Sequence, residues 1–326
     1  MKLSILDQAP ISEGQSAKEA LEASCQLAQV GDEYGFNRFW VAEHHALPSL
    51  ASSTPEVFLG YVGAQTKRIR IGSGATLLPY YKPYKVAENF NMLATLFEGR
   101  VDLGIGRAPG GPSEASEALT DAFLPQVFKM PELVDELIQY NENITGLPPA
   151  NPLPGTPPAL WMLGTSPKSA GFAAENGLSY CFGQFMSDED GAEVVKQYRK
   201  KFQPRGGQDR PHAMLGISVV CADTSEEAHD IADSWAVWQL MQSEGTTAKV
   251  PSSETAHIYM ETAEVPKKVE AAKQKMIIGD PADVVDELER LQNTTGVDEF
   301  MIITITHSPE DKWKSYQLIS EQAANR

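Results

Sequence analysis

The chain has 326 residues and a formal net charge of −17 at neutral pH. A surface that binds nucleic acid needs clustered Lys and Arg to neutralise phosphates, so this charge argues against nucleic acid as a partner. The short basic runs at 199–201 and 267–275 are predicted to be solvated helix faces.

The three cysteines, Cys25, Cys181 and Cys221, are odd in number and lie far apart. They fit buried residues of a reducing compartment better than a disulfide framework, and we expect no redox or metal role for them. Asp7 interrupts the first apolar run, and no apolar stretch of 18 residues occurs. We therefore expect neither a signal peptide nor a membrane span, and a cytoplasmic location.

Short runs of β-branched and aliphatic residues alternate with longer amphipathic stretches, the pattern of repeated βα units around a parallel sheet. Most of the runs are almost continuously apolar, as expected of strands covered on both faces. The eight predicted strands are 3–6, 38–42, 69–72, 101–105, 160–163, 178–182, 214–221 and 299–304. This α/β pattern favours a closed barrel or a doubly wound sheet.

Several helices carry readable start signals. Ser16 and Glu19 have the spacing of a capping box, and Thr224 and Glu227 repeat it. Asp280 before a proline predicts a third helix start, with Gly296 beyond the helix end.

Two segments break the βα rhythm. The proline-rich stretch 146–158 predicts an extended surface connection rather than a domain linker, because the rhythm resumes after it. The polar, weakly periodic stretch 243–266 predicts a mobile lid over a pocket. We therefore expect a single domain over residues 1–326, with insertions in the strand-to-helix loops.

The junction after the second strand reads Glu43, His44, His45. Barrel active sites lie at such strand ends. Adjacent side chains on an extended segment point to opposite sides, so the two histidines are not expected to bind one metal ion, and no metal site is predicted. Either both only cap the barrel rim, with one bonded to Glu43, or one imidazole faces the pocket as an acid, base or hydrogen-bond donor.

The junctions after the fourth and fifth strands suit a phosphate. Arg107 follows a glycine-rich strand end, and its guanidinium offers a permanent, bidentate charge. A dinucleotide-binding loop is not supported, because proline stands at position 109 where GxGxxG needs glycine. After the fifth strand, Thr165 and Ser166 precede Pro167, so a helix N-terminus with the amides of Lys168 and Ser169 is expected, either as an anion site or as an ordinary cap.

Together these junctions resemble the luciferase-like flavin-dependent monooxygenase family. The similar segments are WVAEHH at 40–45, the stretch from IGSGATLLP to GIGRAPGG at 71–111, LGTSPKSAGFAAENGL at 163–178 and the closing segment at 277–304. The N-terminal LSILDQAPI resembles a subgroup that begins LSxLDxAPI. The likeness spans nearly the whole chain.

The resemblance implies a (β/α)8 TIM barrel that binds flavin mononucleotide (FMN), used in reduced form. It implies His44 as the catalytic residue and Arg107 as the phosphate ligand. It also implies cofactor contacts in the turn formed by Gly164, Thr165, Ser166 and Ser169. A non-proline cis peptide that presses against the flavin would fall near Ser73, Gly74 and Ala75. Gly106 stands where the catalytic subunit of bacterial luciferase has a reactive cysteine, so light emission is not implied.

Three functions follow as hypotheses. The first is a monooxygenase that uses reduced FMN and molecular oxygen on a small organic substrate. A separate NAD(P)H flavin reductase would supply the reduced FMN. The second is a deazaflavin-dependent reductase or dehydrogenase, which anaerobic hydride transfer would distinguish from oxygen consumption. The third is a non-catalytic flavin-binding protein, against which the presence of both His44 and Arg107 argues. The resemblance also implies a homodimer formed through the helices beside the second and third strands.

Overall fold

Eight parallel strands close into a barrel in the computed structural model, which describes residues 1–206 and 208–326. Going round the barrel, each strand pairs with the next, and the last pairs with the first. The barrel strands are β1 (Leu3–Asp7), β2 (Arg38–Val41), β3 (Arg70–Leu77), β4 (Val101–Gly106), β5 (Ala159–Gly164), β6 (Ser179–Gly183), β7 (Ala213–Cys221) and β9 (Glu299–Ile303). The TIM-barrel fold predicted from the sequence is confirmed.

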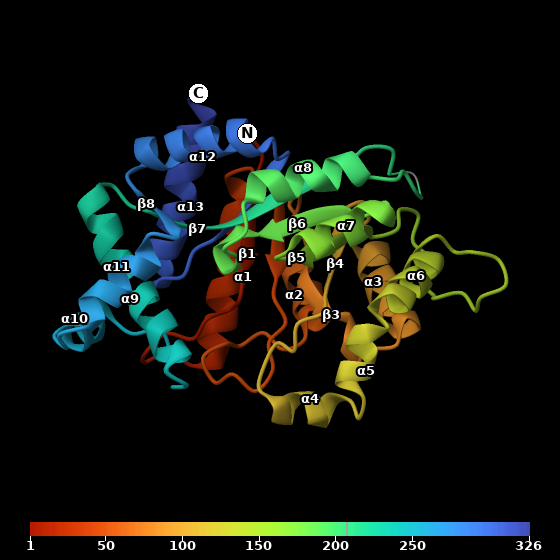
Figure 1. Cartoon of the computed structure of the whole chain (residues 1–326), viewed down its shortest axis with the longest axis horizontal. Helices are drawn as coiled ribbons and strands as arrows, with labels where there is room; N and C mark the ends of the chain where they lie inside the picture. The colour runs from red at the N-terminus through yellow and green to blue at the C-terminus, as the bar shows by residue number, and fades with distance from the viewer. Residues whose placement is uncertain (207) are drawn as a thin grey trace.

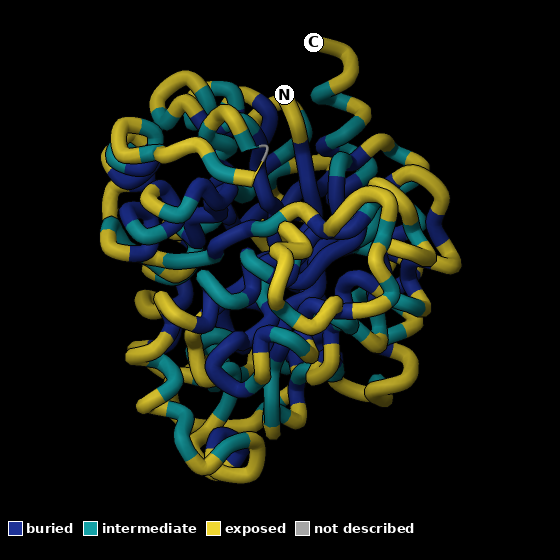
Figure 2. The backbone as a smooth tube through the Cα atoms, turned by 90° about the vertical axis from the view of Figure 1, so that its right-hand side faces the viewer, coloured by how far each residue is buried: buried dark blue, intermediate teal, exposed yellow. Residues whose placement is uncertain are grey.

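Helices surround this barrel, and the buried backbone is concentrated in the strands at the centre (Figures 1 and 2). The outer helices are α1 (Ala17–Glu33), α2 (Pro55–Gln65), α3 (Pro83–Leu96), α6 (Met130–Asn141), α7 (Pro167–Glu175), α8 (Gly191–Lys201), α9 (Ser225–Ser243), α12 (Pro281–Thr295) and α13 (Pro309–Ala324). Among the described residues, no helix combines the length and apolar character needed to cross a bilayer.

Insertions follow several strands, as predicted. After β3 and β6 come the short 3-10 helices Leu78–Tyr80 and Gln184–Met186, and after β4 come α4 (Ser113–Leu119) and α5 (Phe123–Phe128). Figure 1 shows α4 and α5 projecting beyond the barrel at the end opposite the two chain termini.

The predicted helix starts are present. Ser16 and Glu19 form the capping box of α1, and the Thr224 side chain accepts a hydrogen bond from the amide of Glu227 at the start of α9. Asp280 caps α12, which ends at Gly296 with φ of +66°, a left-handed conformation that glycine adopts without steric cost.

The stretch 243–266 was predicted to be a mobile lid over a pocket, and the structure differs from this in both its regular elements and its position. This segment contains α10 (Ser253–Met260) and the start of α11 (Val265–Lys273), and β8 (Met276–Gly279), also not predicted, follows and pairs with β7. Val250 is fully buried and its amide donates to the Ile11 carbonyl. The segment is therefore packed structure, and none of its residues lines the cavity described below.

The proline-rich stretch 146–158 has neither helix nor strand, as predicted. It is docked on α3, because the Asn91 side-chain amide donates to the buried carbonyl of Ala150 at 2.7 Å. It connects α6 to β5 across the barrel exterior.

A charged cluster fills the barrel interior towards its N-terminal end. The Arg38 guanidinium on β2 lies 2.7 Å from the Asp102 carboxylate on β4 and 2.8 Å from the Glu299 carboxylate on β9. Arg70 pairs with the other oxygen of Asp102. Burial alone would raise the pKa of Glu299, but His212 and Arg38 lower it to about 2. Charges fixed in this way connect four strands, β2, β3, β4 and β9, and fill the N-terminal end of the barrel.

Candidate functional site

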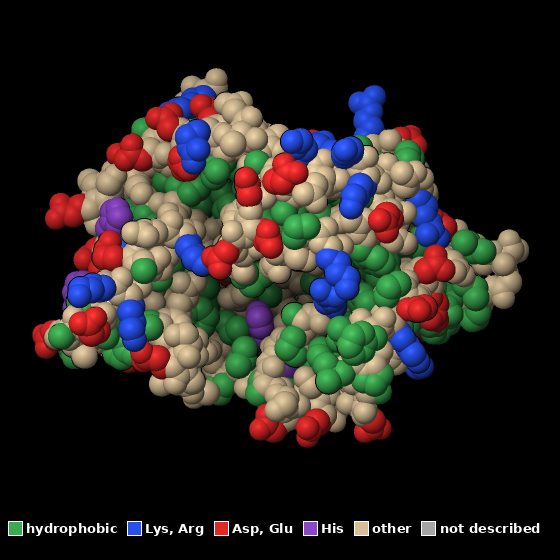
Figure 3. Space-filling model, viewed as in Figure 1, with side chains coloured by type: hydrophobic (Ala, Val, Ile, Leu, Met, Phe, Trp, Pro, Cys, Tyr) green, Lys and Arg blue, Asp and Glu red, His purple; other side chains and the backbone are tan. Residues whose placement is uncertain are grey.

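A cavity of about 370 Å³ opens at the C-terminal ends of the barrel strands. This volume lies in the range of small-molecule and cofactor sites, and this end of a barrel is where active sites lie. Figure 3 shows the surface hollowed between apolar side chains, with a histidine inside the hollow, and His44 is the histidine that lines the cavity. The wall is mainly apolar, with a few polar groups from different strands.

The cavity brings together all of the predicted site residues except Ser73. Its lining includes His44, Gly74, Ala75, Arg107, Gly164, Thr165, Ser166 and Ser169. Ser73 is fully buried, and its hydroxyl donates to the Gly104 carbonyl at 2.8 Å. Ser73 was predicted as part of a backbone segment against the cofactor, and this stays a prediction, while its side chain bonds β3 to β4 within the sheet.

The end of β3 contributes backbone rather than side chains. The peptide bond between Gly74 and Ala75 is cis, as the family resemblance implies. The pairing of β3 with β4 shifts register between Ser73 and Thr76, so this stretch departs from the ladder. A Cβ at Gly74 would lie 2.8 Å from the end of the Leu6 side chain and 3.2 Å from Cβ of Trp40, so the main chain packs closely here. A flat ligand could therefore approach the main chain here.

His44 and His45 point in different directions, as alternation along an extended segment predicts. His44 Nδ1 lies 3.3 Å from the Gly110 carbonyl oxygen. Because a carbonyl oxygen only accepts, the proton sits on Nδ1, and Nε2 remains an acceptor for a group in the cavity. Burial lowers the pKa of His44 below its usual 6.5. The imidazole is therefore neutral at pH 7.

His45 lies away from the cavity and binds Glu43. Its Nε2 lies 2.7 Å from a Glu43 carboxylate oxygen, which also accepts from the Tyr81 hydroxyl at 2.7 Å. The other carboxylate oxygen accepts from the Leu77 amide at 2.9 Å. Burial raises the pKa of Glu43. Through these hydrogen bonds Glu43 fixes the end of β3 against the segment that carries His44. His45 is bonded to Glu43 at the rim, whereas His44 lines the cavity.

Arg107 stands at the cavity mouth as an exposed cation. Within the described residues it forms no ion pair, unlike Arg38 and Arg70. An unpaired guanidinium at the mouth of a site is suited to an anionic group of a ligand.

The start of α7 lies on the same cavity. Ser166 is the N-cap and Pro167 the first helical residue, as predicted. The amide of Ser169 already bonds to the Ser166 hydroxyl, so of the two amides expected at this end only that of Lys168 is left without a partner inside the helix. The exposed Thr165 hydroxyl adds a donor beside it. Arg107, Thr165 and this amide together can bind a phosphate.

Ser169 has a structural part as well. Its hydroxyl donates to the Ser166 carbonyl at 2.8 Å and lies 3.0 Å from the Tyr180 hydroxyl. Any side chain at Gly164 would overlap with Ser169, so glycine at this position lets α7 start directly against the end of β5. This packing aims the N-terminus of α7 at the cavity.

The sequence analysis missed the lining contributed by the other strands. The missed residues lie on, or shortly beyond, the strands β1, β6, β7 and β9. They are Leu6, Gln8, Cys181, Gly183, Phe185, Met186, Gly216 and Met301. A signal was available for Gln8, which directly follows β1, whereas Gly216 and Met301 lie within their strands and carried none.

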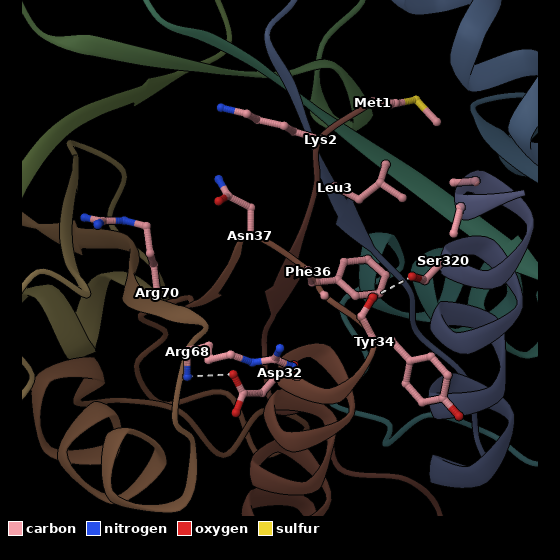
Figure 4. Close-up of a pocket in the computed structure, with 13 residues that line it drawn as sticks. Met1, Lys2, Leu3, Asp32, Tyr34, Phe36, Asn37, Arg68, Arg70 and Ser320 are labelled. Atoms are coloured by element: carbon pink, nitrogen blue, oxygen red, sulfur yellow. Dashed lines mark hydrogen bonds between the residues drawn. The ribbon is translucent and has the colours of Figure 1, made fainter. Parts of the chain in front are cut away.

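A second cavity, of about 500 Å³, lies at the opposite end of the barrel (Figure 4). Most of its polar groups already serve the fold. The Asp32 carboxylate accepts from the amides of residues 67–69, and Arg70 is bonded to Asp102. The Ser320 hydroxyl donates to the Tyr34 carbonyl at 2.6 Å. Polar groups at this end of a barrel serve stability, so we assign the functional site to the other cavity.

Asp230, Asp233 and His257 form the one group of metal-type donors found in the described residues. It lies on the surface away from both cavities, and the Asp233 carboxylate accepts from Lys273 at 2.8 Å. The ammonium group of Lys273 thus already neutralises Asp233, and we assign no metal to this group.

Known proteins resemble this chain in both sequence and fold. The family model described as luciferase-like monooxygenase matches residues 1–299. Protein YwcH of Bacillus subtilis (strain 168) is 40% identical over 100% of both chains, and N-acetyl-S-alkylcysteine monooxygenase of the same strain is 37% identical over 98% of each. The solved structure of apo-MsnO8 matches with a TM-score of 0.94 and 34% identity, over 99% of this chain and 98% of that one. The chain therefore belongs to the luciferase-like monooxygenase family of enzymes.

Proposed function

We propose that this protein is an FMN-dependent monooxygenase that uses reduced FMN and molecular oxygen to oxygenate a small organic substrate. The observation that carries the proposal is the cavity itself. It combines an unpaired Arg107 and a helix N-terminus on one side with the neutral imidazole of His44 on another. An oxygenating constituent of 3,6-diketocamphane monooxygenase in complex with FMN shares the fold, with a TM-score of 0.71 at 19% identity.

The residues present fit this cofactor. Arg107, the Thr165 hydroxyl, Ser166 and the Lys168 amide would hold the phosphate, and the Gly74 and Ala75 backbone would support the ring system. Bound reduced FMN supplies the electrons that activate oxygen. His44, held by Gly110, would accept a proton at Nε2 beside the reacting atoms. Apolar walls exclude water from this region.

The first test replaces Arg107 with alanine. Affinity for FMN is expected to fall by about 1.5 to 3 kcal/mol, the scale of a charge-assisted hydrogen bond, as measured by calorimetric titration. Riboflavin lacks the phosphate and should bind the variant nearly as well as the wild type. Arg68→Ala is the matched control, since Arg68 lines the cavity at the other end of the barrel. Equal losses for FMN and riboflavin would contradict the assignment.

A deazaflavin-dependent reaction is the second candidate. An F420-dependent secondary alcohol dehydrogenase shares the fold, with a TM-score of 0.70 at 14% identity. Oxygen uptake with reduced FMN supports the monooxygenase, whereas anaerobic hydride transfer with a reduced deazaflavin supports this alternative. A chain that binds FMN without either turnover would be a non-catalytic flavin-binding protein.

We propose that residues 1–326 act as one cytoplasmic domain and receive reduced FMN from a separate NAD(P)H flavin reductase. The oxygenase component of a flavin-dependent trigonelline monooxygenase from Acinetobacter baylyi is 24% identical over 89% of this chain. The word component in its name supports a two-protein arrangement. Reduced FMN supplied by an unrelated reductase should then sustain turnover.

We also propose a homodimer formed through α2 and α3. Val57 and Tyr61 on α2, and Met92 and Leu96 on α3, are each at least half exposed, and the two helices pack side by side. Large apolar side chains grouped on adjacent helices are typical of a protein interface. Leu96→Glu is expected to shift the species in sedimentation from twice the 35.6 kDa chain mass to the chain mass. Ile258→Glu, on α10, is the control. A wild-type monomer would contradict the proposal.

A further inference from the structure

The closed order of the barrel divides the cavity into two sides. Arg107 follows β4, and the α7 N-terminus follows β5. In the barrel order, β1 stands opposite β5, with β2 on one side of it and β9 on the other. A phosphate at β4 and β5, with the ring system against β3, therefore leaves the part lined from β1, β2, β6, β7 and β9 for the substrate. We refer to this part as the substrate side.

The substrate side is apolar. Leu6, Phe185, Met186 and Met301 supply its large side chains. Burial raises the pKa of Cys181 to about 12, so its thiol stays neutral. A small molecule held there needs an apolar body.

Charge is also absent from the substrate side as far as the structure describes its lining. Glu43 is the one carboxylate among the lining residues, and its oxygens accept hydrogen bonds from Leu77, Tyr81 and His45. The cation of the cavity, Arg107, belongs to the opposite side. A charged substrate group placed here would lose its water without gaining an ionic partner.

Gln8 is the exception in this apolar lining. It is half-buried, it lies directly beyond β1, and its side-chain amide forms no hydrogen bond with any described residue. The backbone around it is nevertheless fixed. The Asp7 carboxylate accepts from the Ala9 amide and from Lys312, both at 3.1 Å, and the Ala9 carbonyl accepts from the Ala51 amide. The fold therefore holds Gln8 in place without using its amide.

We propose that Gln8 is a specificity-determining residue, and that the substrate is a small, largely apolar molecule with one uncharged hydrogen-bonding group that meets the Gln8 amide. The proposal rests on the proposed function, because FMN defines which side is left for the substrate. A few placed polar groups in an apolar site fix orientation and reject analogues that lack the matching group. Gln8 offers both a donor and an acceptor, and it lines the same cavity as His44, beyond the end of the strand that pairs with β2.

The test uses the FMN-loaded enzyme and three probes of matched shape: benzamide, benzene and benzoate. Their binding is measured by the change in absorbance of bound FMN. Wild-type enzyme is expected to bind benzamide about tenfold more tightly than either of the other two, the scale of one hydrogen bond in a buried site. In Gln8→Leu the advantage of benzamide over benzene should disappear, whereas FMN affinity should stay within twofold. Gln26→Leu, an exposed change on α1, should behave as the wild type.

Three results with the probes would overturn the proposal. The first is benzoate binding as tightly as benzamide, the second is a benzamide advantage that survives in Gln8→Leu, and the third is no binding of any probe. A loss of FMN affinity in Gln8→Leu would also overturn it, by assigning Gln8 to the cofactor. Failure of the wild type to bind FMN overturns the proposed function as well, and the FMN titration alone reveals it.

Discussion

Replacing His44 with alanine is expected to lower turnover by about 10² or more, the usual scale for lost acid or base work. The variant loses the imidazole that lines the cavity, while Arg107 and the start of α7 stay intact. FMN affinity should therefore change by no more than a few-fold. Turnover would be measured as product formed with reduced FMN under oxygen, with FMN titration in parallel.

The pH profile separates a catalytic role of His44 from a structural one. Burial lowers its pKa, so the neutral, working form persists below pH 6.5, and activity should fall only when lower pH protonates Nε2. This acid limb should be absent from the residual activity of His44→Ala. His45→Ala is the matched control. It removes one of three donors to Glu43 and should lower thermal stability more than turnover. Wild-type turnover in His44→Ala would rule out the catalytic role.

Replacing Glu299 with glutamine is expected to destabilise the fold by about 3 kcal/mol or more, because removing one partner of a buried ion pair leaves the other charge incompletely compensated. Glu299 accepts from Arg38, from Asn37 at 3.0 Å and from Ser4. A pKa lowered from 4.5 to about 2 corresponds to a similar free energy. Urea unfolding at neutral pH would measure the loss.

The pH dependence of stability has a definite sign. Because the folded-state pKa of Glu299 lies below its unfolded value, its contribution is fully present above pH 4.5 and is lost as pH falls towards 2. Glu299→Gln should lack this part of the acid dependence. Glu287→Gln, which breaks a surface pair with Arg290, should cost no more than about 1 kcal/mol. Equal effects of the two substitutions would contradict the account of the interior cluster.

The barrel was predictable because its strands are continuous apolar runs with helix caps between them. All eight runs became barrel strands, because most of their residues are buried and the local pattern matched the tertiary environment. β8 was missed because a strand of four residues, paired only with β7, carries too little pattern. The helix α10 was missed because its buried residue Ala256 gives a weak apolar signal within a polar segment.

The site was predictable where a strand end carried unusual residues. His44, Arg107 and Thr165 stood out by chemistry at such junctions, and the cavity brings them together. Ser73 was named with Gly74 and Ala75 for the backbone of this segment, and its side chain bonds β3 to β4 instead of lining the cavity. Gln8 did not stand out in the sequence. An amide side chain indicates a binding role only when the side chains around it are known to be apolar.

We propose that the cavity at the C-terminal end of the barrel holds FMN with its phosphate between Arg107 and the start of α7. A crystal structure of the wild-type protein with FMN tests it most directly. The account predicts phosphate oxygens within hydrogen-bond distance of Arg107, Thr165 and the Lys168 amide, with the ring system against Gly74 and Ala75. A phosphate bound elsewhere, such as beside Lys2 and Arg68 in the cavity at the opposite end, would contradict it.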